Sequence, residues 1–119
     1  MNLEQVMHQK NFVIVGDTLN KNKYAYKIKQ AMIKNKYNVF SVGKELQSIN
    51  DVETDIDIID LCIHPAKGVK LLQENKKPFK SIVIQPGAES EELLTYLNTQ
   101  NIPYIQDCLL IGLEKKQEN

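Results

Sequence analysis

The sequence predicts a three-layer α/β fold, in which a five-stranded parallel sheet carries helices on both faces. Short apolar runs rich in β-branched residues alternate along the chain with segments that have helical spacing of apolar residues. The run 12–15 is continuously apolar and the run 56–63 is rich in isoleucine, as expected for strands that are buried on both faces. Strands that alternate with helices in this way form parallel sheets through right-handed crossovers. We expect the strand order 2-1-3-4-5.

The first half of the chain predicts two strands and two helices. Leu3, Val6 and Met7 follow the i, i+3, i+4 rule of a short amphipathic helix. The first strand is 12–15, and a helix follows over about 23–35. The second strand is 38–42. The apolar stripe of the second helix is predicted to consist of Tyr24, Ala25, Ile28, Ala31 and Met32.

The second half begins with a polar connection over 43–55 and a third strand over 56–63. Pro65 suits the first turn of the next helix, because its missing N–H costs nothing there. The fourth strand is 81–85. The following helix is predicted to begin with acidic residues, which the helix dipole stabilises near an N-terminus; they are Glu89, Glu91 and Glu92. The fifth strand is 102–105. We expect one domain over 1–113 and a polar C-terminal tail over 114–119.

The composition limits the class of partner. The chain has 119 residues, which is the size of one domain, and its 15 basic residues balance 15 acidic ones. A chain without net charge lacks the basic field that nonspecific nucleic-acid binding requires. All basic residues are lysines, so no guanidinium group is present for bidentate capture of an anion. We expect a ligand held at a local site, and no nucleic-acid partner.

The cysteine pattern and hydropathy predict a cytoplasmic protein. Cys62 and Cys108 belong to no CxxC motif and no Cys/His cluster with metal-ligand spacing, so we expect no metal site. Two isolated cysteines fit a reducing compartment. No stretch approaches the ~18 apolar residues that a membrane span requires, so we expect no membrane partner.

Ligands of such sheets bind beyond the carboxyl ends of the strands, where the strand order reverses. The segments that follow the predicted strands are 16–18, 42–44, 64–65, 85–88 and 106–108. The first leads into a helix whose free N–H groups form a potential anion site. Gly16 is the single glycine of this loop, so the loop is neither a GxGxxG fingerprint nor a Walker loop.

Lysines surround this potential anion site. Residues 18–44 contain seven lysines and no acid, whereas 45–62 contain six acids and no lysine. Lysines on the first long helix either form a solvated helix face or contribute to the anion site; they are Lys27, Lys29, Lys34 and Lys36. Lys21 and Lys23 lie on the loop itself and are better candidates for ligand binding.

Several polar residues leave two interpretations open. Asp17 would repel a phosphate unless it caps a helix or contacts a ribose hydroxyl. His64 either contacts a ligand or is an ordinary residue at a strand end. Cys108 is either a nucleophile or inert. At least one of Asp57 and Asp60 needs a partner or marks the edge of the third strand. No Ser/His/Asp, metal or paired-carboxylate motif assigns a reaction.

Over nearly its whole length the sequence resembles the small stand-alone CoA-binding domain proteins of bacteria, which are related to the N-terminal domain of the succinyl-CoA synthetase alpha subunit. The order and spacing of the matching stretches carry this resemblance. They are residues 12–18, 23–26, 37–42, 58–62, Pro65, 83–87 and 107–109.

The resemblance implies a Rossmann-like fold that binds CoA or acyl-CoA along the strand ends and is not an enzyme. Under this hypothesis Gly16, Thr18, Lys21 and Lys23 hold phosphate. Lys44 and His64 line the adenosine side. The pantetheine is flanked by Gln85, Gly87 and Ala88. The expected site also includes Asp17, Tyr26, Val42, Gly43 and Pro65.

Departures from the family pattern support rival hypotheses. Lys23 stands where the family has an arginine, His64 replaces another, and Gly43 and Lys44 replace an Asn-Pro pair. One alternative is a domain whose ligand site has decayed and which acts as a scaffold or regulatory protein, bound to a second copy of itself or to another protein. The other is an enzyme that uses Cys108 as an acyl acceptor, which predicts a depressed thiol pKa.

Overall fold

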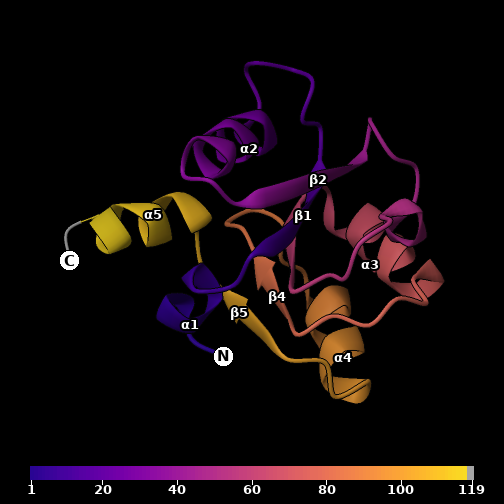
Figure 1. Ribbon diagram of the computed structural model, residues 1–119. Coiled ribbons are helices and arrows are strands. Elements are labelled where there is room, and N and C mark those ends of the chain that lie inside the picture. The colour runs from indigo at the N-terminus through magenta and orange to yellow at the C-terminus, as the bar shows by residue number, and fades with distance from the viewer. Residues whose placement is uncertain (118–119) are drawn as a thin grey trace.

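The apolar runs form one parallel sheet in the computed structural model, which describes residues 1–117. The strands are β1 Asn11–Gly16, β2 Asn38–Gly43, β3 Ile58–Cys62, β4 Ser81–Ile84 and β5 Tyr104–Gln106. Their order is β2-β1-β3-β4-β5, and all four neighbouring pairs are parallel (Figure 1). The predicted fold class and strand order are confirmed.

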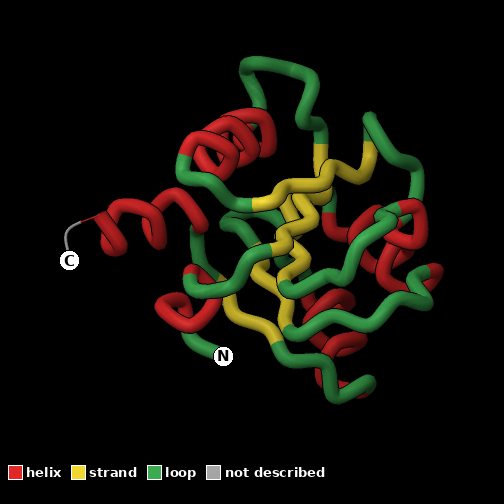
Figure 2. The backbone as a smooth tube through the Cα atoms, in the orientation of Figure 1, coloured by secondary structure: helices red, strands yellow, loops and turns green. Residues whose placement is uncertain are grey.

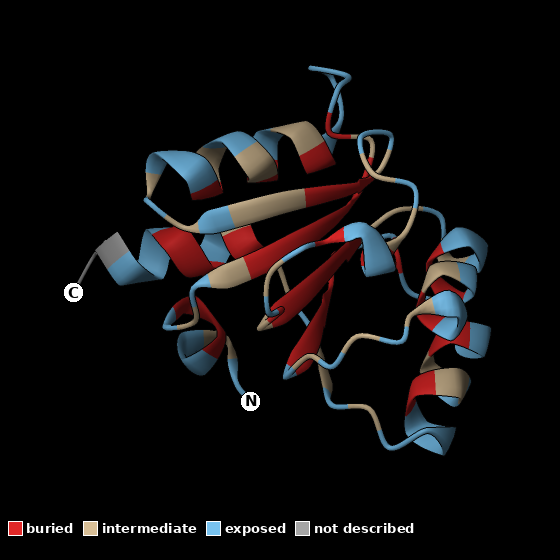
Figure 3. Ribbon diagram, turned by 45° about the vertical axis from the view of Figure 1, so that its right-hand side comes forward, coloured by how far each residue is buried: buried red, intermediate tan, exposed pale blue. Residues whose placement is uncertain are grey.

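Helices cover both faces of the sheet, so that two apolar cores form (Figures 2 and 3). One face carries α1 Leu3–Met7, α2 Tyr24–Lys34 and α5 Leu109–Gln117, and the other carries α3 Pro65–Glu74 and α4 Glu91–Thr99. Successive residues of β1 alternate between the cores, as the pleat requires. Phe12 and Ile14 pack beneath the first group of helices, and Val13 and Val15 beneath the second. None of the helices within residues 1–117 combines the length and apolar character needed to cross a membrane.

Side-chain caps determine where some helices begin. The Asn2 carboxamide accepts the N–H of Gln5 at 2.8 Å, and the Gln5 carboxamide accepts the N–H of Asn2 at 2.9 Å. The Ser90 hydroxyl accepts the N–H of Leu93 at 3.0 Å, so α4 begins after Ser90. Glu89, which the sequence placed in the first turn, precedes this cap.

Helix α5 was not predicted. It spans Leu109–Gln117 and thus includes the first residues of the expected polar tail, while 118–119 lie outside the described residues. Its apolar residues are consecutive, which hides the helical period. Gly112 lets α5 approach α1 closely, because a Cβ at this position would lie 2.7 Å from the Met7 sulfur. Lys116 donates to the carbonyl of Met7 at 3.2 Å and to the hydroxyl of Tyr37 at 3.0 Å.

Two further segments differ from prediction. The polar connection before β3 contains the short 3₁₀ helix η1 Ile49–Asp51, and Ile49 and Val52 are buried in the core beside α3. The prediction that Tyr24 belongs to the apolar stripe of α2 is wrong, because this residue is 62% exposed. It lies at the first position of the helix and lines a cleft at the carboxyl edge of the sheet, while its neighbour Ala25 is buried in the core.

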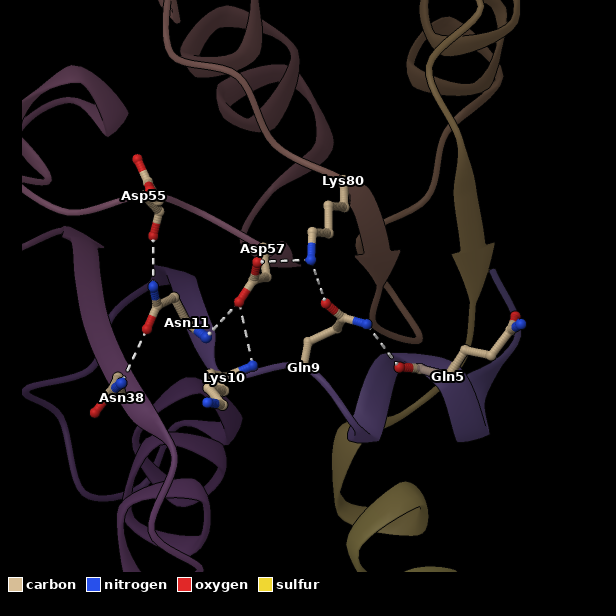
Figure 4. A network of polar contacts seen from close by, with 8 residues as sticks. All are labelled: Gln5, Gln9, Lys10, Asn11, Asn38, Asp55, Asp57 and Lys80. Atoms are coloured by element: carbon tan, nitrogen blue, oxygen red, sulfur yellow. Dashed lines mark hydrogen bonds and ion pairs between the residues drawn. The ribbon is translucent and has the colours of Figure 1, made fainter.

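A polar network closes the amino end of the sheet (Figure 4). The Asp57 carboxylate accepts the N–H of Asn11 at 2.9 Å and that of Lys10 at 3.2 Å, and it pairs with the Lys80 ammonium at 3.3 Å. The Asn11 side chain donates to the carbonyl of Asp55 at 2.9 Å. Asp57 thus has the partners that its position required.

Candidate functional site

A cleft of about 470 Å³ lies at the carboxyl edge of the sheet, beside the ends of β1 and β3. This is the point where the strand order reverses, because β1 has β2 on one side and β3 on the other. The lining residues are Asp17, Asn22, Lys23, Tyr24, Ala25, Cys62, Ile63, His64, Pro65, Pro86, Gly87 and Ala88. The volume falls in the ~300–1,000 Å³ range of small-molecule sites.

The cleft borders a close approach of two strands at Gly16. A Cβ on Gly16 would lie 2.3 Å from the carbonyl oxygen of Cys62, so only glycine fits there. The backbone therefore turns directly from β1 into the loop at the mouth of the cleft. This packing is the physical reason for the lone glycine that the sequence shows.

The loop after β1 is held by Asp17. Its carboxylate accepts the N–H groups of Leu19 and Asn20, each at 3.1 Å. Asp17 therefore caps a turn of this loop and not α2, whose N-cap is Lys23. Lys23 occupies the N-cap of α2 and provides no side-chain cap. The first turn of α2 begins at the cleft, which Lys23, Tyr24 and Ala25 line, and free N–H groups beside a lysine favour an anion.

The hydroxyl of Thr18 is committed to a contact within the protein. It is buried and donates to Glu45 at 2.5 Å, and the Lys29 ammonium contacts the same carboxylate oxygen at 2.6 Å. The Lys29 ammonium, with the Thr18 hydroxyl, lowers the pKa of Glu45. This contact joins the loop after β1 to the segment after β2 and leaves Thr18 outside the cleft lining.

The opposite wall comes from the ends of β3 and β4. His64 is the N-cap of α3, and its Nδ1 accepts the N–H of Ala66 at 3.3 Å while the residue lines the cleft. Gly87 adopts a φ of 94° and donates its N–H to Glu89 at 2.8 Å. The wall is therefore built from loops whose conformations are fixed by local hydrogen bonds.

The structure brings part of the predicted site together. Predicted residues that line the cleft are Asp17, Lys23, His64, Pro65, Gly87 and Ala88. Predicted residues outside the lining are Gly16, Thr18, Lys21, Tyr26, Val42, Gly43, Lys44 and Gln85. The lining residues that sequence reasoning missed are Asn22, Tyr24, Ala25, Cys62, Ile63 and Pro86. An aromatic residue at the first position of a helix after a strand-end loop was the available signal for Tyr24.

A buried polar pair lies next to the cleft. The Gln85 side-chain N–H donates to Asp60 Oδ1 at 2.5 Å, and both side chains are at most 3% exposed. Burial raises the pKa of Asp60 to about 7, and the Gln85 hydrogen bond opposes this shift. Burial also raises the pKa of the Cys62 thiol to about 12, with contributions from Asp60 and Cys108. Among residues 1–117, no three His, Cys, Asp or Glu side chains gather as metal ligands.

The CoA binding domain family matches residues 10–114 of this chain. The chain belongs to the CoA-binding domain family. The match includes every strand of the sheet and all residues that line the cleft. No curated protein matches this CoA-binding domain at a significant level.

Solved structures share the fold of this CoA-binding domain. A conserved hypothetical protein from Pyrococcus furiosus is 25% identical with a TM-score of 0.78, over 87% of this chain and 98% of that one. A protein redesigned for binding is 18% identical with a TM-score of 0.83, over 95% and 87%. A Thermus thermophilus protein is 17% identical with a TM-score of 0.78, over 97% and 98%.

Proposed function

We propose that this protein is a module that binds CoA or acyl-CoA without catalysing a reaction. The observation that carries the proposal is the family match, because it spans the cleft and all of its lining residues. The nucleotide end of the ligand lies at the start of α2, where free N–H groups and Lys23 favour phosphate. The remainder runs across the ends of β3 and β4 toward Gly87 and Ala88.

Two contacts support binding without catalysis. Asp17 and His64, the acid and the imidazole that line the cleft, both accept hydrogen bonds from backbone N–H groups near them in sequence. Each side chain thus holds a loop in shape. Other lining residues are left for CoA: Lys23 for phosphate, Tyr24 for a stacked base, and Pro86 and Gly87 for the arm.

The contact between Thr18 and Glu45 favours a second candidate function. A carboxylate of this chain already holds the hydroxyl that the resemblance assigns to phosphate. This arrangement fits a domain that no longer binds CoA and acts as a scaffold or regulatory protein. The two functions differ in a direct measurement of ligand binding.

Thermal unfolding with CoA, dephospho-CoA, acetyl-CoA, NAD and ADP tests the proposal. A ligand at ~100 times its Kd stabilises the fold by ~2.7 kcal/mol, which raises the Tm of a small domain by several degrees. We expect CoA to raise the Tm and dephospho-CoA to raise it less. No rise with any of the compounds would refute CoA binding and favour the scaffold function.

Paired lysine variants locate the phosphate. The double variant Lys21→Ala/Lys23→Ala should lower CoA affinity, whereas Lys34→Ala/Lys70→Ala removes the same charge from exposed helix positions away from the cleft lining. Equal losses of affinity in the two double variants would show a general charge effect and remove Lys21 and Lys23 from the site.

A further inference from the structure

A second groove lies outside the cleft, between the two helices that come from opposite ends of the chain. It has a volume of about 860 Å³ and is lined by α1 and α5, which lie side by side on one face of the sheet (Figure 1). Among residues 1–117, no residue lines both this groove and the cleft. The volume falls in the ~300–1,000 Å³ range of small-molecule sites. The groove is therefore large enough for a ligand of its own.

The floor of this groove is apolar. Of its lining residues, Met7 and Gly112 are buried and Leu3 is half-buried, so these three form the floor. A Cβ on Gly112 would lie 2.7 Å from the Met7 sulfur and 3.2 Å from a methyl carbon of Leu3. Glycine thus lets both side chains lie directly against the backbone of α5. The flexible thioether of Met7 can adapt to an apolar ligand that is laid along it.

The rim of the groove carries an excess of cationic and N–H donor groups. His8, Lys115 and Lys116 line it and are exposed, and the one acidic residue of the lining is Glu4. The Lys116 ammonium already donates to two oxygens of the protein, at 3.2 and 3.0 Å. Within residues 1–117, neither the Lys115 ammonium nor the His8 imidazole has a hydrogen bond or an ion pair. One ammonium and one imidazole therefore remain to donate to a ligand.

These groups limit the charge of the ligand. The two lysines and Glu4 leave one net positive charge at the groove, which a single carboxylate neutralises. A molecule with several negative charges, such as a nucleotide, would be repelled by Glu4 without enough cations to compensate. The ammonium of Lys115 and an N–H of His8 can each donate to one oxygen of a carboxylate. The apolar floor and this rim together suit a molecule that has one carboxylate and an apolar chain.

We propose that the groove between α1 and α5 binds a free monocarboxylate with an apolar chain, of the class of medium-chain fatty acids. The chain lies over Leu3 and Met7, and the carboxylate faces Lys115 and His8. Such a ligand contacts both helices and therefore joins the N-terminal end of the chain to the C-terminal end. This site is separate from the cleft proposed for CoA, and it does not depend on CoA binding.

Octanoate is the probe for this proposal, and 1-octanol is its uncharged counterpart. Calorimetry measures the affinity of the whole protein for both compounds, and for octanoate again with CoA present. We expect octanoate to bind at least about 5-fold more tightly than 1-octanol, and CoA to change its affinity less than about twofold. Equal binding of the two compounds would show that the rim has no role and would overturn the proposal. Displacement of octanoate by CoA would place it in the cleft and would also overturn it.

A pair of lysine variants locates the carboxylate. Lys115→Gln removes the free ammonium of the rim, and Lys70→Gln is the matched control, because it removes an exposed lysine from α3 on the other face of the sheet. We expect Lys115→Gln to weaken octanoate binding at least about 5-fold and Lys70→Gln to change it less than about twofold. Equal effects of the two variants, or no effect of Lys115→Gln, would refute the site.

Hydrogen exchange locates the ligand independently of any substitution. Octanoate should slow the exchange of amide protons in both α1 and α5, because a ligand that contacts both helices opposes their separation. Slower exchange confined to the segments around the cleft would place octanoate there and contradict the proposal.

Discussion

Asp57 and Asp60 stand three residues apart at β3, and their surroundings differ completely. Asp57, at the amino end, accepts two backbone N–H groups and pairs with Lys80. Asp60, nearer the carboxyl end, is fully buried and has Gln85 as its hydrogen-bond partner. Both oxygens of Asp57 have partners, whereas no group in residues 1–117 pairs with Asp60 Oδ2.

This difference separates a carboxylate that is held by several partners from a buried one that has a single side-chain partner. The network around Asp57 ties the start of β1 to Lys80, just before β4 (Figure 4). The pair at Asp60 ties β3 to β4 through a single side-chain hydrogen bond. We therefore expect substitutions at Asp57 and at Asp60 both to change stability, with opposite dependence on pH.

The largest expected effect comes from the pH dependence of Asp60. Burial raises its pKa from 3.8 to about 7, so the folded state holds a proton that the unfolded state has released. Stability is therefore lost as pH rises between about 4 and 7. The free energy of unfolding should fall by about 3 kcal/mol between pH 5 and pH 8. Urea unfolding at both values measures this fall.

Asp60→Asn is the control for that measurement, because it removes the titrating group and keeps its shape. The titratable group whose pKa responds to Asp60 within residues 1–117 is the Cys62 thiol, which stays protonated over this range. The variant should therefore lose most of the pH dependence. The same fall in both proteins would assign it to other groups and contradict the buried state of Asp60.

Asp57→Ala is expected to have the next largest effect. The stability that Asp57 contributes depends on pH in the opposite direction to that of Asp60. Burial acts to raise the pKa of Asp57, but the N–H groups of Asn11 and Lys10 and the Lys80 ammonium outweigh it, so the pKa is lowered. The carboxylate stabilises the fold above about pH 4, and this contribution is lost at lower pH. At pH 7 the variant should be about 2 kcal/mol less stable by urea unfolding, with unchanged CoA affinity. A stability equal to that of the unaltered protein would show that the network is not needed.

Lys80→Ala should have the smallest effect. Its side chain is 56% exposed, so its ion pair with Asp57 is screened by water. We expect a loss below about 1 kcal/mol in the same unfolding experiment. A loss as large as that of Asp57→Ala would mean that the ion pair, and not the two backbone hydrogen bonds, closes the amino end.

The fold was predictable because its information is local. The β-branched run that forms β1 and the apolar stripe that includes Ile28 and Met32 each identify an element, and their alternation identifies the parallel sheet. Helix α5 was not predicted, because its apolar residues are consecutive and do not follow the helical period. The burial of Ile49 was not predicted, because its 3₁₀ turn lies in a segment whose composition is polar.

Residues of the candidate site could be predicted only where their position directly after a strand places them at the cleft. Residues directly after strands, such as Asp17, His64 and Gly87, reach the cleft because all strands of a parallel sheet end at one edge. The contact between Thr18 and Glu45 joins residues 27 positions apart through a side-chain rotamer, which no spacing rule reveals. For the same reason, sequence alone did not identify Gln85 as the partner of Asp60.

The packing of α1 against α5 at Gly112 has a consequence for cooperative unfolding (Figure 1). Helix α1 has five residues, too few to persist as an isolated helix in water. Its order depends on α5, and the bonds from Lys116 to Met7 and Tyr37 join both helices to the segment before β2. The two ends of the sequence should therefore unfold locally together. When α5 detaches from the sheet, the amide protons of α1 should exchange with solvent as well.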